Sequence, residues 1–456
     1  MLSAFINSFK IPELRQRIFF TLGVIALVRF GAAIPAPGVD ASILAHYFEQ
    51  VNNQTSSSVV ALFNIFSGGA LEACAVFSLG IMPYISASII IQLLTAVYPR
   101  LAKTAREEGG RAKITQYTRY LTLILCLFQG TLLAHGFANP KSNPFLPGID
   151  ATIQQYGPLV ANPDFFFYFS CIMTLTAGTM LLMWFGEQIT DKGIGQGISV
   201  IITIGILARL PAAITQSYHF FSDKFNPVII AILLLFLFGV IAGIVAVTSA
   251  ERKIPVQFAK RMVGRKLYGG QTTFMPLKVN YAGVMPIIFA QAILMFPQTF
   301  LMIPGLQKLP GFQELMGMLN PGTVLHVLLY GIMIFFFSYF WVSTQFNPTQ
   351  IADDLKKNSG YIPGVRPGKP TADFLDFTMT RLTLAGAAFL TIIAILPEMV
   401  NYNLKVSFLV AQFFGGTSLL ICVGVVLDTM RQVETFLLQR HYDGFLKKGR
   451  LRSRQS

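Results

Sequence analysis

The sequence predicts an all-α polytopic membrane protein, with ten transmembrane helices in two five-helix halves of opposite orientation. Three observations predict this class: the composition, the spacing of the apolar stretches and the distribution of basic residues. Of 456 residues, 53% are apolar and only 12% are charged, and the mean hydropathy is +0.58. A soluble domain carries about 25% charged residues. Too few ionised side chains are therefore present to cover a water-facing surface, which indicates a chain that crosses a membrane.

Ten apolar stretches are long enough to cross a hydrocarbon core about 30 Å thick. They cover residues 18–36, 75–97, 118–138, 164–185, 196–215, 227–248, 282–304, 323–345, 382–398 and 407–429. The first stretch follows basic residues, as a signal peptide does. However, Arg29 interrupts it, and no run of small residues before Pro35 offers a cleavage site. We therefore expect the first stretch to be a retained span.

Basic residues alternate between the loops that join these spans. They gather at the N-terminus, in the second, sixth and eighth loops and in the C-terminal tail, whereas the odd-numbered loops hold one each or none. The fourth loop, with Lys192 alone, gives the weakest signal. An excess of lysine and arginine marks the cytoplasmic side, so we expect both termini and the even-numbered loops there. Membrane topology therefore accounts for the net charge of +14, and the charge is no argument for binding of nucleic acid.

One apolar stretch is too short to span a membrane. It runs from Val59 to Phe66 and is followed by Ser67-Gly68-Gly69. About eight residues suit a re-entrant or partly inserted segment, and non-helical backbone at membrane depth is stable only inside protein or beside a watery cavity. The segment is therefore either re-entrant or partly inserted, beside a cavity open to the outside, or an interfacial helix on the outer surface. Its length alone does not decide between these two.

An internal repeat relates the second span to the seventh. GIMPYISASII at 80–90 matches GVMPIIFAQAI at 283–293 in six of eleven positions. The same offset carries neighbouring spans onto one another, so the chain divides into two halves. An odd number of spans per half inverts the second half, and in such proteins the functional path lies between the halves. Pro83 and Pro286 limit hydrogen bonding near the starts of these spans, which become candidate moving elements. Chance similarity and tolerated kinks are the competing interpretations.

The ionisable residues of the spans argue against an ion-coupled transporter. Such a protein needs a charged or titratable group near the bilayer midplane, but here these residues lie toward span ends: Arg29, His135, Glu187, His326 and Glu398. The five histidines are scattered, so we expect no metal site. Phosphate-binding loops and the common hydrolase motifs are absent from the sequence. We therefore expect neither an enzyme nor a cofactor.

Isoleucine recurs at four-residue spacing near the starts of two spans. Ile81 and Ile85 share one face of the second span, Ile198 and Ile202 share one face of the fifth, and Ile288 occupies the repeat position of Ile85. If these faces converge, they form an apolar constriction that ions cross only by losing water. Contact with lipid or with other helices is the alternative.

Two basic loops on the predicted cytoplasmic side are unusually long. The sixth and eighth loops, 249–280 and 346–381, exceed the usual two to six residues several-fold. They are rich in turn-forming residues, as in YIPGVRPG at 361–368. Such loops suit an acidic protein partner or RNA, and contact with lipid headgroups is the alternative.

Five motifs resemble those of the bacterial SecY protein-translocation channels. They are FNIFSGGALEACAVFSLGIMPYISASIIIQLL at 63–94, GEQITDKGIGQGIS at 186–199, PLKVNYAGVMPIIFA at 276–290, GVRPGKPTADFLDFTMTRLTL at 364–384 and GGTSLLICVGVVLD at 415–428. The resemblance covers nearly the whole chain. It implies two halves, 18–215 and 216–429, around a central pore. The implied function is to move unfolded secretory polypeptides across the membrane and to release transmembrane segments laterally into lipid.

The resemblance also assigns roles to individual residues. It implies a plug at 59–71, with Val59, Phe63, Ile65, Phe66, Ser67, Gly68 and Gly69, and a pore ring of Ile81, Ile85, Ile198, Ile202, Ile288 and Ile421. Spans two and three would face spans seven and eight across a lateral gate whose polar cluster is Ser86, Gln129 and Asn280. The residues implied for cytoplasmic docking are Lys253, Arg265, Lys266 and Arg366.

The family further implies partners and a location. The partners are the SecE and SecG subunits, the SecA ATPase, a ribosome with its nascent chain, signal sequences of preproteins and membrane lipid. The location is the bacterial plasma membrane, with the segment 1–17 and the tail 430–456 in the cytoplasm; whether two copies associate stays open. One departure concerns the plug exit, where many relatives carry a basic residue and this chain reads Glu72-Ala73-Cys74. A contact made through that basic charge is therefore in doubt.

Overall fold

The computed structural model describes residues 11–448, apart from 54–58, 108, 141–145, 147, 224–226, 259–260, 264–265, 269–271, 301–302, 304–310 and 405–407. Up to residue 223 its helices are α2 (Pro12–Gly31), α3 (Ala41–Asn53), α4 (Val59–Phe66), α5 (Met82–Val97), α6 (Pro99–Arg106), α7 (Gly110–Ala138), α8 (Ile149–Tyr156), α9 (Phe165–Lys192), α10 (Gly197–Ala208) and α11 (Leu210–Asp223). The later helices are α12 (Pro227–Ser249), α13 (Met285–Thr299), α14 (Phe312–Met318), α15 (Val324–Gln345), α16 (Pro348–Lys357), α17 (Lys369–Leu404), α18 (Phe408–Gly415) and α19 (Thr417–Lys448).

The predicted helical, polytopic architecture is confirmed. Within the described residues, six helices are long and apolar enough to cross a membrane, and a seventh is added if the bent pair α5 and α6 counts as one span. The count of ten spans remains a prediction. The second span was predicted to begin at residue 75, but its helix begins only at Met82. Turns occupy the residues before it, and Gly80 has a φ of +57°, a left-handed conformation that favours glycine and interrupts a helix.

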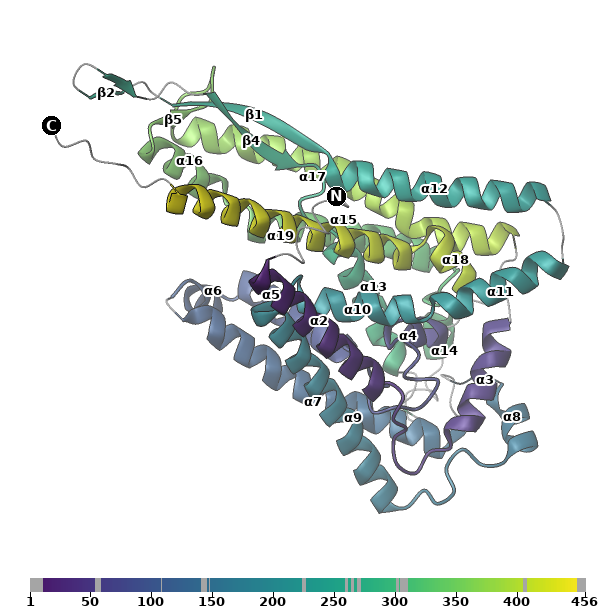
Figure 1. Cartoon of the computed structure of the whole chain (residues 1–456). Helices are drawn as coiled ribbons and strands as arrows, with labels where there is room; N and C mark the ends of the chain where they lie inside the picture. Colours follow the sequence, from purple (N-terminus) through teal and green to yellow (C-terminus); the bar gives the residue numbers. More distant parts are fainter. Residues whose placement is uncertain are drawn as a thin grey trace.

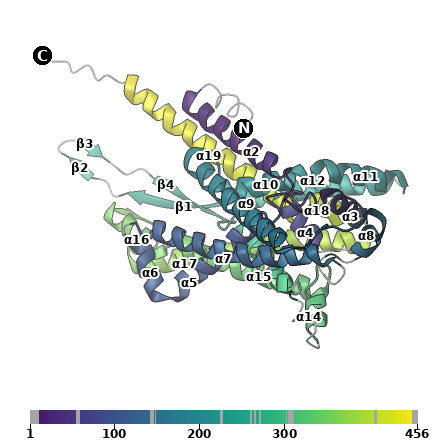
Figure 2. The same cartoon turned by 90° about the horizontal axis from the view of Figure 1, so that it is seen from below.

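The helices before residue 224 pack chiefly with one another, and so do the later ones. In the first group α7 lies between α5 and α9, and in the second α15 lies between α13 and α17. The two groups meet where α5 contacts α13, where α10 contacts α19 and where α11 contacts α18. Figure 1 shows α4 in the middle of the molecule, near α10 and α13, and Figure 2 also shows it among the other helices. The two groups therefore face each other across a region that contains a short helix.

A small sheet joins the two predicted docking loops. Strands β1 (Glu251–Phe258) and β4 (Thr272–Lys278) pair antiparallel, and β5 (Gly360–Tyr361), from the other loop, adds to the free side of β1. Two short strands, β2 (Arg261–Val263) and β3 (Lys266–Tyr268), pair beyond them. These strands lie within the two loops between predicted spans, and the chain remains mostly helical, as predicted. In Figure 1 they extend away from the helices at the end that carries α6 and α16, opposite to α3 and α8.

The sheet is held to the helices by an apolar cluster of its own. Side chains that alternate along β1 and β4, such as Ile254, Val256 and Leu277, pack with Phe346 and Leu375 from the second loop and α17. The cluster is separate from the main core. Burying one of these side chains contributes about 1.5–3 kcal/mol. The described residues of 251–278 and 346–375 therefore pack as one unit, which we call the docking unit.

Helix α9 approaches the turns before α5 closely, which yields a first prediction. A Cβ atom added at Gly178 would lie 2.1 Å from the carbonyl oxygen of Val76. We expect Gly178→Ala to lower the thermal stability of the detergent-purified protein, because overpacking destabilises by about 1–3 kcal/mol. Gly23→Ala in α2 is the matched control, since no atom lies within 4 Å of its Cβ position. Equal melting temperatures for the two variants would contradict the close approach.

Candidate functional site

Helix α4 is buried inside the protein. The side chains of Phe63, Ile65 and Phe66 are 7%, 2% and 6% exposed, and the helix packs against α10; the side chain of Val59 lies outside the described residues. An interfacial helix would expose one face to the outer surface. Burial of these side chains therefore favours the inserted segment over the interfacial helix.

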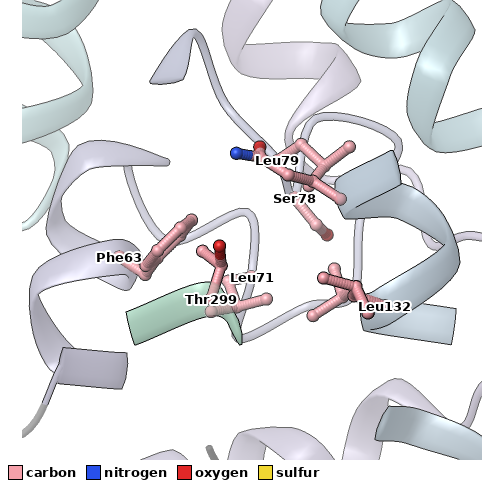
Figure 3. Close-up of a pocket in the computed structure, with 8 residues that line it drawn as sticks. Phe63, Leu71, Ser78, Leu79, Leu132 and Thr299 are labelled. Atoms are coloured by element: carbon pink, nitrogen blue, oxygen red, sulfur yellow. The ribbon is translucent and has the colours of Figure 1, made fainter. Parts of the chain in front are cut away.

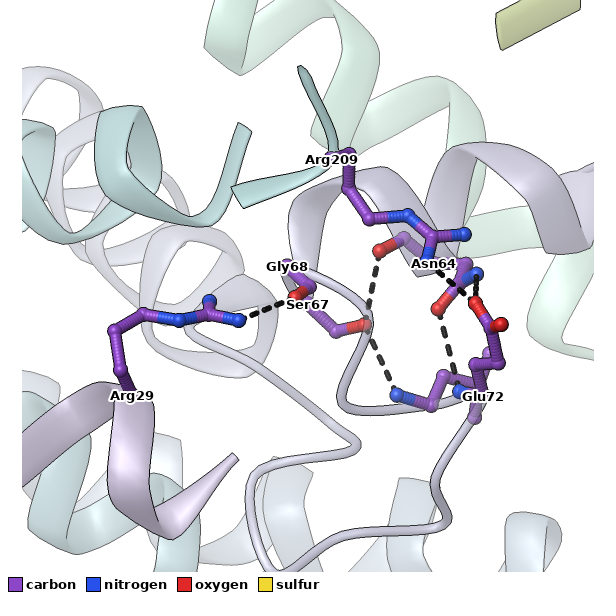
Figure 4. Close-up of polar contacts among 7 residues, drawn as sticks. Arg29, Asn64, Ser67, Gly68, Glu72 and Arg209 are labelled. Carbon is purple, nitrogen blue, oxygen red and sulfur yellow. Dashed lines mark hydrogen bonds and ion pairs between the residues drawn. The ribbon is translucent and has the colours of Figure 1, made fainter. Parts of the chain in front are cut away.

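Two arginines from different spans contact the turn that follows α4 (Figure 4). The Arg209 guanidinium, at the end of α10, forms an ion pair with the Glu72 carboxylate, which also accepts a hydrogen bond from the Asn64 amide at 3.2 Å. From α2, Arg29 donates to the carbonyl oxygen of Gly68 at 3.1 Å. Both arginines are thus directed at the segment 64–72, and we call these contacts the plug clamp.

The turn itself requires glycine where it meets α10. Gly68 has a φ of +67°, and a Cβ atom there would lie 2.7 Å from the Cα atom of Gly205. Two facing glycines allow the backbones to approach this closely. The hydroxyl of Ser67 donates to the carbonyl oxygen of Asn64 and accepts from the amide of Leu71, which closes the turn locally.

Apolar side chains on the other side of α4 enclose a small cavity (Figure 3). Phe63 and Leu71 line it together with Leu132 of α7 and Thr299 of α13. Since α7 and α13 belong to the two different groups of helices, the cavity beside the segment borders both groups.

The structure buries the isoleucines predicted to form a constriction. Ile81, Ile85, Ile202, Ile288 and Ile421 are each at most 3% exposed and belong to the main apolar core, which also contains Phe63, Ile65 and Phe66; Ile198 packs against that core. They come from α10, α13, α19 and the start of α5, so four helices contribute to the predicted ring. No polar side chain is among the six.

The junction proposed as a lateral gate is closed. Helices α5 and α13 are in contact, and the rings of Phe128 and Phe300 lie 6.0 Å apart where α7 approaches the end of α13. All three predicted polar residues are buried, but Gln129 lines the small cavity beside α4, and Asn280 donates to the carbonyl oxygen of Gly283. The Oε1 atom of Gln129 has no hydrogen-bond partner in the described structure.

A larger cavity of about 230 Å³ lies between α10, α13 and α19. Asn280 is part of its lining, together with Lys278, Asp428 and Arg431. The walls therefore carry charge, in contrast to the apolar layer formed by the isoleucines. Among the described residues, no three His, Cys, Asp or Glu side chains gather as metal ligands.

Three of the four residues predicted for docking lie in the described part of the docking unit. Lys253 on β1 and Arg366, in the turn between β5 and α17, are both exposed. The Arg366 carbonyl accepts from the Thr371 hydroxyl, which fixes the turn to the start of α17. Lys266 lies on β3, and Arg265 is outside the described residues.

Sequence reasoning missed the partners that the fold brings together. Glu72 was noted only as a departure from the family, and Arg209 was not singled out, yet they pair over a separation of 137 residues. Glu187 pairs with Arg119 at 2.7 Å, and Glu398 lies 3.4 Å from His326. The one available signal was that Arg209 is a lone arginine inside the predicted fifth span, 196–215, because such a charge needs a partner.

Comparison with known proteins agrees with this architecture. The SecY family model matches residues 75–430. The protein translocase subunit SecY of Escherichia coli strain K12 is 45% identical over 443 residues, covering 96% of this chain and 95% of the relative, and that of Chlamydia muridarum is 44% identical over 455 residues, covering 98% of each.

Solved structures with a similar fold are more distant in sequence. A protein-conducting channel superposes with a TM-score of 0.61 at 18% identity, covering 94% of this chain and 96% of the other. Sec61 in the canine ribosome-channel complex from the endoplasmic reticulum gives 0.58 at 17% identity, with the same coverage.

Two facing groups of helices with a short helix buried between them define a polytopic membrane protein with the fold of the protein-conducting channels. The identity to curated relatives along almost the full length then decides the family. The chain belongs to the SecY family.

Proposed function

We propose that the chain is the central pore-forming subunit of a Sec translocon, which moves unfolded secretory polypeptides across a membrane and releases transmembrane segments into lipid. The observation that carries this proposal is the buried helix α4, held by the plug clamp where the two groups of helices meet. A transporter would need a solute site there instead. The relatives at about 45% identity are protein translocase subunits, which supports the same function.

In this proposal the structure is the closed state, and two barriers lie in series. Residues 59–71 form the plug on the outer side, and Ile81, Ile85, Ile198, Ile202, Ile288 and Ile421 form the ring beneath it. A layer of isoleucine excludes ions because they would have to shed their hydration, whereas its flexible side chains part around a polypeptide. Docking of partners and of an apolar signal sequence opens the channel by binding the open form better.

The lateral gate would open between α5 and α7 on one side and α13 and α15 on the other. Apolar segments leave through it into lipid because Asp, Lys or Arg at a helix centre disfavours the membrane by about 2.5–3.5 kcal/mol. Ser86, Gln129 and Asn280 are the polar residues of this seam. Interhelical hydrogen bonds of about 0.6–2 kcal/mol each would form and break there as the gate moves.

The docking unit would receive the partner that drives transport. Its exposed Lys253 and Arg366 suit an acidic protein surface or ribosomal RNA, and a related channel, Sec61, is known in a ribosome-channel complex. We assign ATP hydrolysis to the SecA ATPase and expect SecE and SecG as companion subunits. The corresponding location is the bacterial plasma membrane, with both termini in the cytoplasm, as the basic loops predict.

Reversal of one charge tests the proposed function. The chain is reconstituted with SecE in proteoliposomes, and translocation of a secretory precursor is measured with SecA and ATP. We expect translocation by the unaltered chain and a loss of about tenfold or more in Arg366→Glu, which corresponds to about 1.4 kcal/mol of docking free energy. The control Lys192→Glu reverses a positive charge in the same way at the exposed last residue of α9. Undiminished export by Arg366→Glu would remove the docking role, and no export by the unaltered chain would contradict the function.

A further inference from the structure

A second polar site lies away from the plug clamp, in a cavity lined by residues of α13, α15, α17, α18, the start of α19 and the plug helix α4. The side chains that line it include Leu62, Gln291, Gln298, His326, Tyr330 and Glu398. Its polar members are nearly all more than nine-tenths buried, and Leu62 of α4 supplies an apolar wall. None of these polar side chains takes part in the closure described above.

The hydrogen bonds of His326 constrain where its protons are. Its Nδ1 atom lies 2.9 Å from the carbonyl oxygen of Leu319. A carbonyl only accepts, so Nδ1 carries a proton and donates it. Its Nε2 atom lies 3.4 Å from Oε1 of Glu398. If the imidazole is neutral, Nε2 then presents a lone pair to a carboxylate oxygen, and two acceptors repel each other. One further proton, on Nε2 or on the carboxyl group, replaces this repulsion with a hydrogen bond between the two side chains.

The remaining oxygens of the site lack partners in the described structure. They are Oε1 of Gln291, Oε1 of Gln298, the hydroxyl of Tyr330 and Oε2 of Glu398. The Gln298 amide nitrogen donates to the Leu319 carbonyl oxygen at 2.7 Å, so the Oε1 atom of the same amide is directed away from that carbonyl. Buried polar atoms without partners are destabilising by about 1–3 kcal/mol each. The cavity has room for the centre of about one water molecule, some 10 Å³, and a buried water typically satisfies two to four such groups.

We propose that this cavity is a proton-binding site, in which His326 and Glu398 share one excess proton and an ordered water molecule bridges the unpartnered oxygens. The ligands are therefore a proton and water. Without the excess proton the site would hold a buried negative charge that faces the backbone N–H of Gly322 but no Lys or Arg side chain of the described lining, which is disfavoured; with it the pair is neutral overall. His326, Tyr330 and Glu398 are the titratable groups that line the cavity within the described residues, and α4, α13, α18 and the start of α19 contribute uncharged side chains.

Proton binding at this site is linked to the position of the plug, a consequence that rests on the proposed function. Leu62 seals the cavity while α4 is seated. When α4 leaves, water can enter and solvate an unprotonated pair, so the seated state binds the proton more tightly. Acid therefore favours the seated plug and alkali favours its departure. One linked proton changes the ratio of the two states by at most about tenfold per pH unit.

The proton is tested first without reference to any channel activity. The chain has only five histidines, so nitrogen-15 labelling of histidine in the full complex, in lipid nanodiscs, gives few signals, and His326→Gln identifies the one of interest. We expect Nδ1 of His326 to be protonated and its Nε2 to be protonated or strongly hydrogen-bonded near neutral pH, with magnetisation transfer from a slowly exchanging water. A bare Nε2 that accepts no hydrogen bond would overturn the proposal.

The linkage is tested by the opening frequency of the complex in planar bilayers between about pH 5 and 8. We expect opening to increase with pH, and Glu398→Gln to remove this dependence, because a glutamine amide can donate to Nε2 without a titrating proton. The matched control is Glu49→Gln, which alters the exposed His46–Glu49 pair and should leave the dependence intact. An unchanged pH dependence in Glu398→Gln would overturn the linkage. If His326 is protonated but the opening frequency of the unaltered channel does not change with pH, the proton site is retained and the assignment of α4 as the plug is wrong.

Discussion

Replacement of Ile85 and Ile288 by serine is expected to make the idle channel leak ions. Both side chains are at most 3% exposed, and they come from α5 and α13, which meet at the junction of the two helical groups. Two hydroxyl groups let water wet a layer that otherwise excludes it, so the barrier to dehydrated ions falls. We expect the resting conductance of the purified complex in planar bilayers to increase by about tenfold or more, which is a drop of about 1.4 kcal/mol in the barrier.

A core substitution of this kind also weakens packing, so a control is needed. Ile393→Ser on α17 removes an equally buried isoleucine, 4% exposed, from the same core but outside the predicted ring. Loss of each such side chain lowers the free energy of unfolding by about 2–5 kcal/mol, so both variants should be less stable than the unaltered chain. We expect Ile393→Ser to lower thermal stability without a leak. An unaltered resting conductance in the double serine variant, or an equal leak in Ile393→Ser, would contradict the ring assignment.

Removal of the Glu72 carboxylate is expected to release the plug. Glu72→Ala leaves the Arg209 guanidinium, which is 11% exposed, without its anion, and its Nε atom already lacks a hydrogen-bond partner. A hydrogen bond to a charged group contributes about 1.5–3 kcal/mol, so the seated state should lose roughly one to two powers of ten in population. The expected result is a higher opening frequency at rest and export of precursors with defective signal sequences.

A double-mutant cycle separates the ion pair from general damage. If Glu72 acts through Arg209, then Arg209→Met should cause a similar release, and the double variant Glu72→Ala with Arg209→Met should not add the two effects. The Arg29 contact to the Gly68 carbonyl stays in place throughout. Strict additivity of the two single substitutions would show that Glu72 and Arg209 act independently, contrary to the plug clamp.

Much of the candidate site could be predicted from the sequence because hydrophobicity in a membrane protein is a local signal. The eight-residue apolar stretch at 59–66 was too short to span, and the structure contains it as the buried helix α4. The isoleucine spacing placed Ile81, Ile85, Ile198, Ile202 and Ile288 on helix faces, and the structure buries them in or against one core. Ile421 was predicted only from the family resemblance, because no isoleucine lies four residues before or after it.

The strands of the docking unit could have been recognised in part. Ile254, Val256 and Phe258 recur at every second position, separated by Pro255 and Gln257, which is the period of a half-buried strand. The pairing of β5 with β1 joins Tyr361 to Gln257 across 104 residues. No local pattern encodes such a contact.

The sequence alone determined that this chain spans a membrane repeatedly, where its apolar and basic segments fall, and which family it resembles. Each of these properties depends on the residue types within one short segment, because transfer free energies are nearly additive along the chain. Only the tertiary structure decided that Glu72 meets Arg209, that His326 meets Glu398 and that two loops share one sheet. Such contacts depend on distances between segments far apart in the sequence, and packing of the whole molecule fixes those distances.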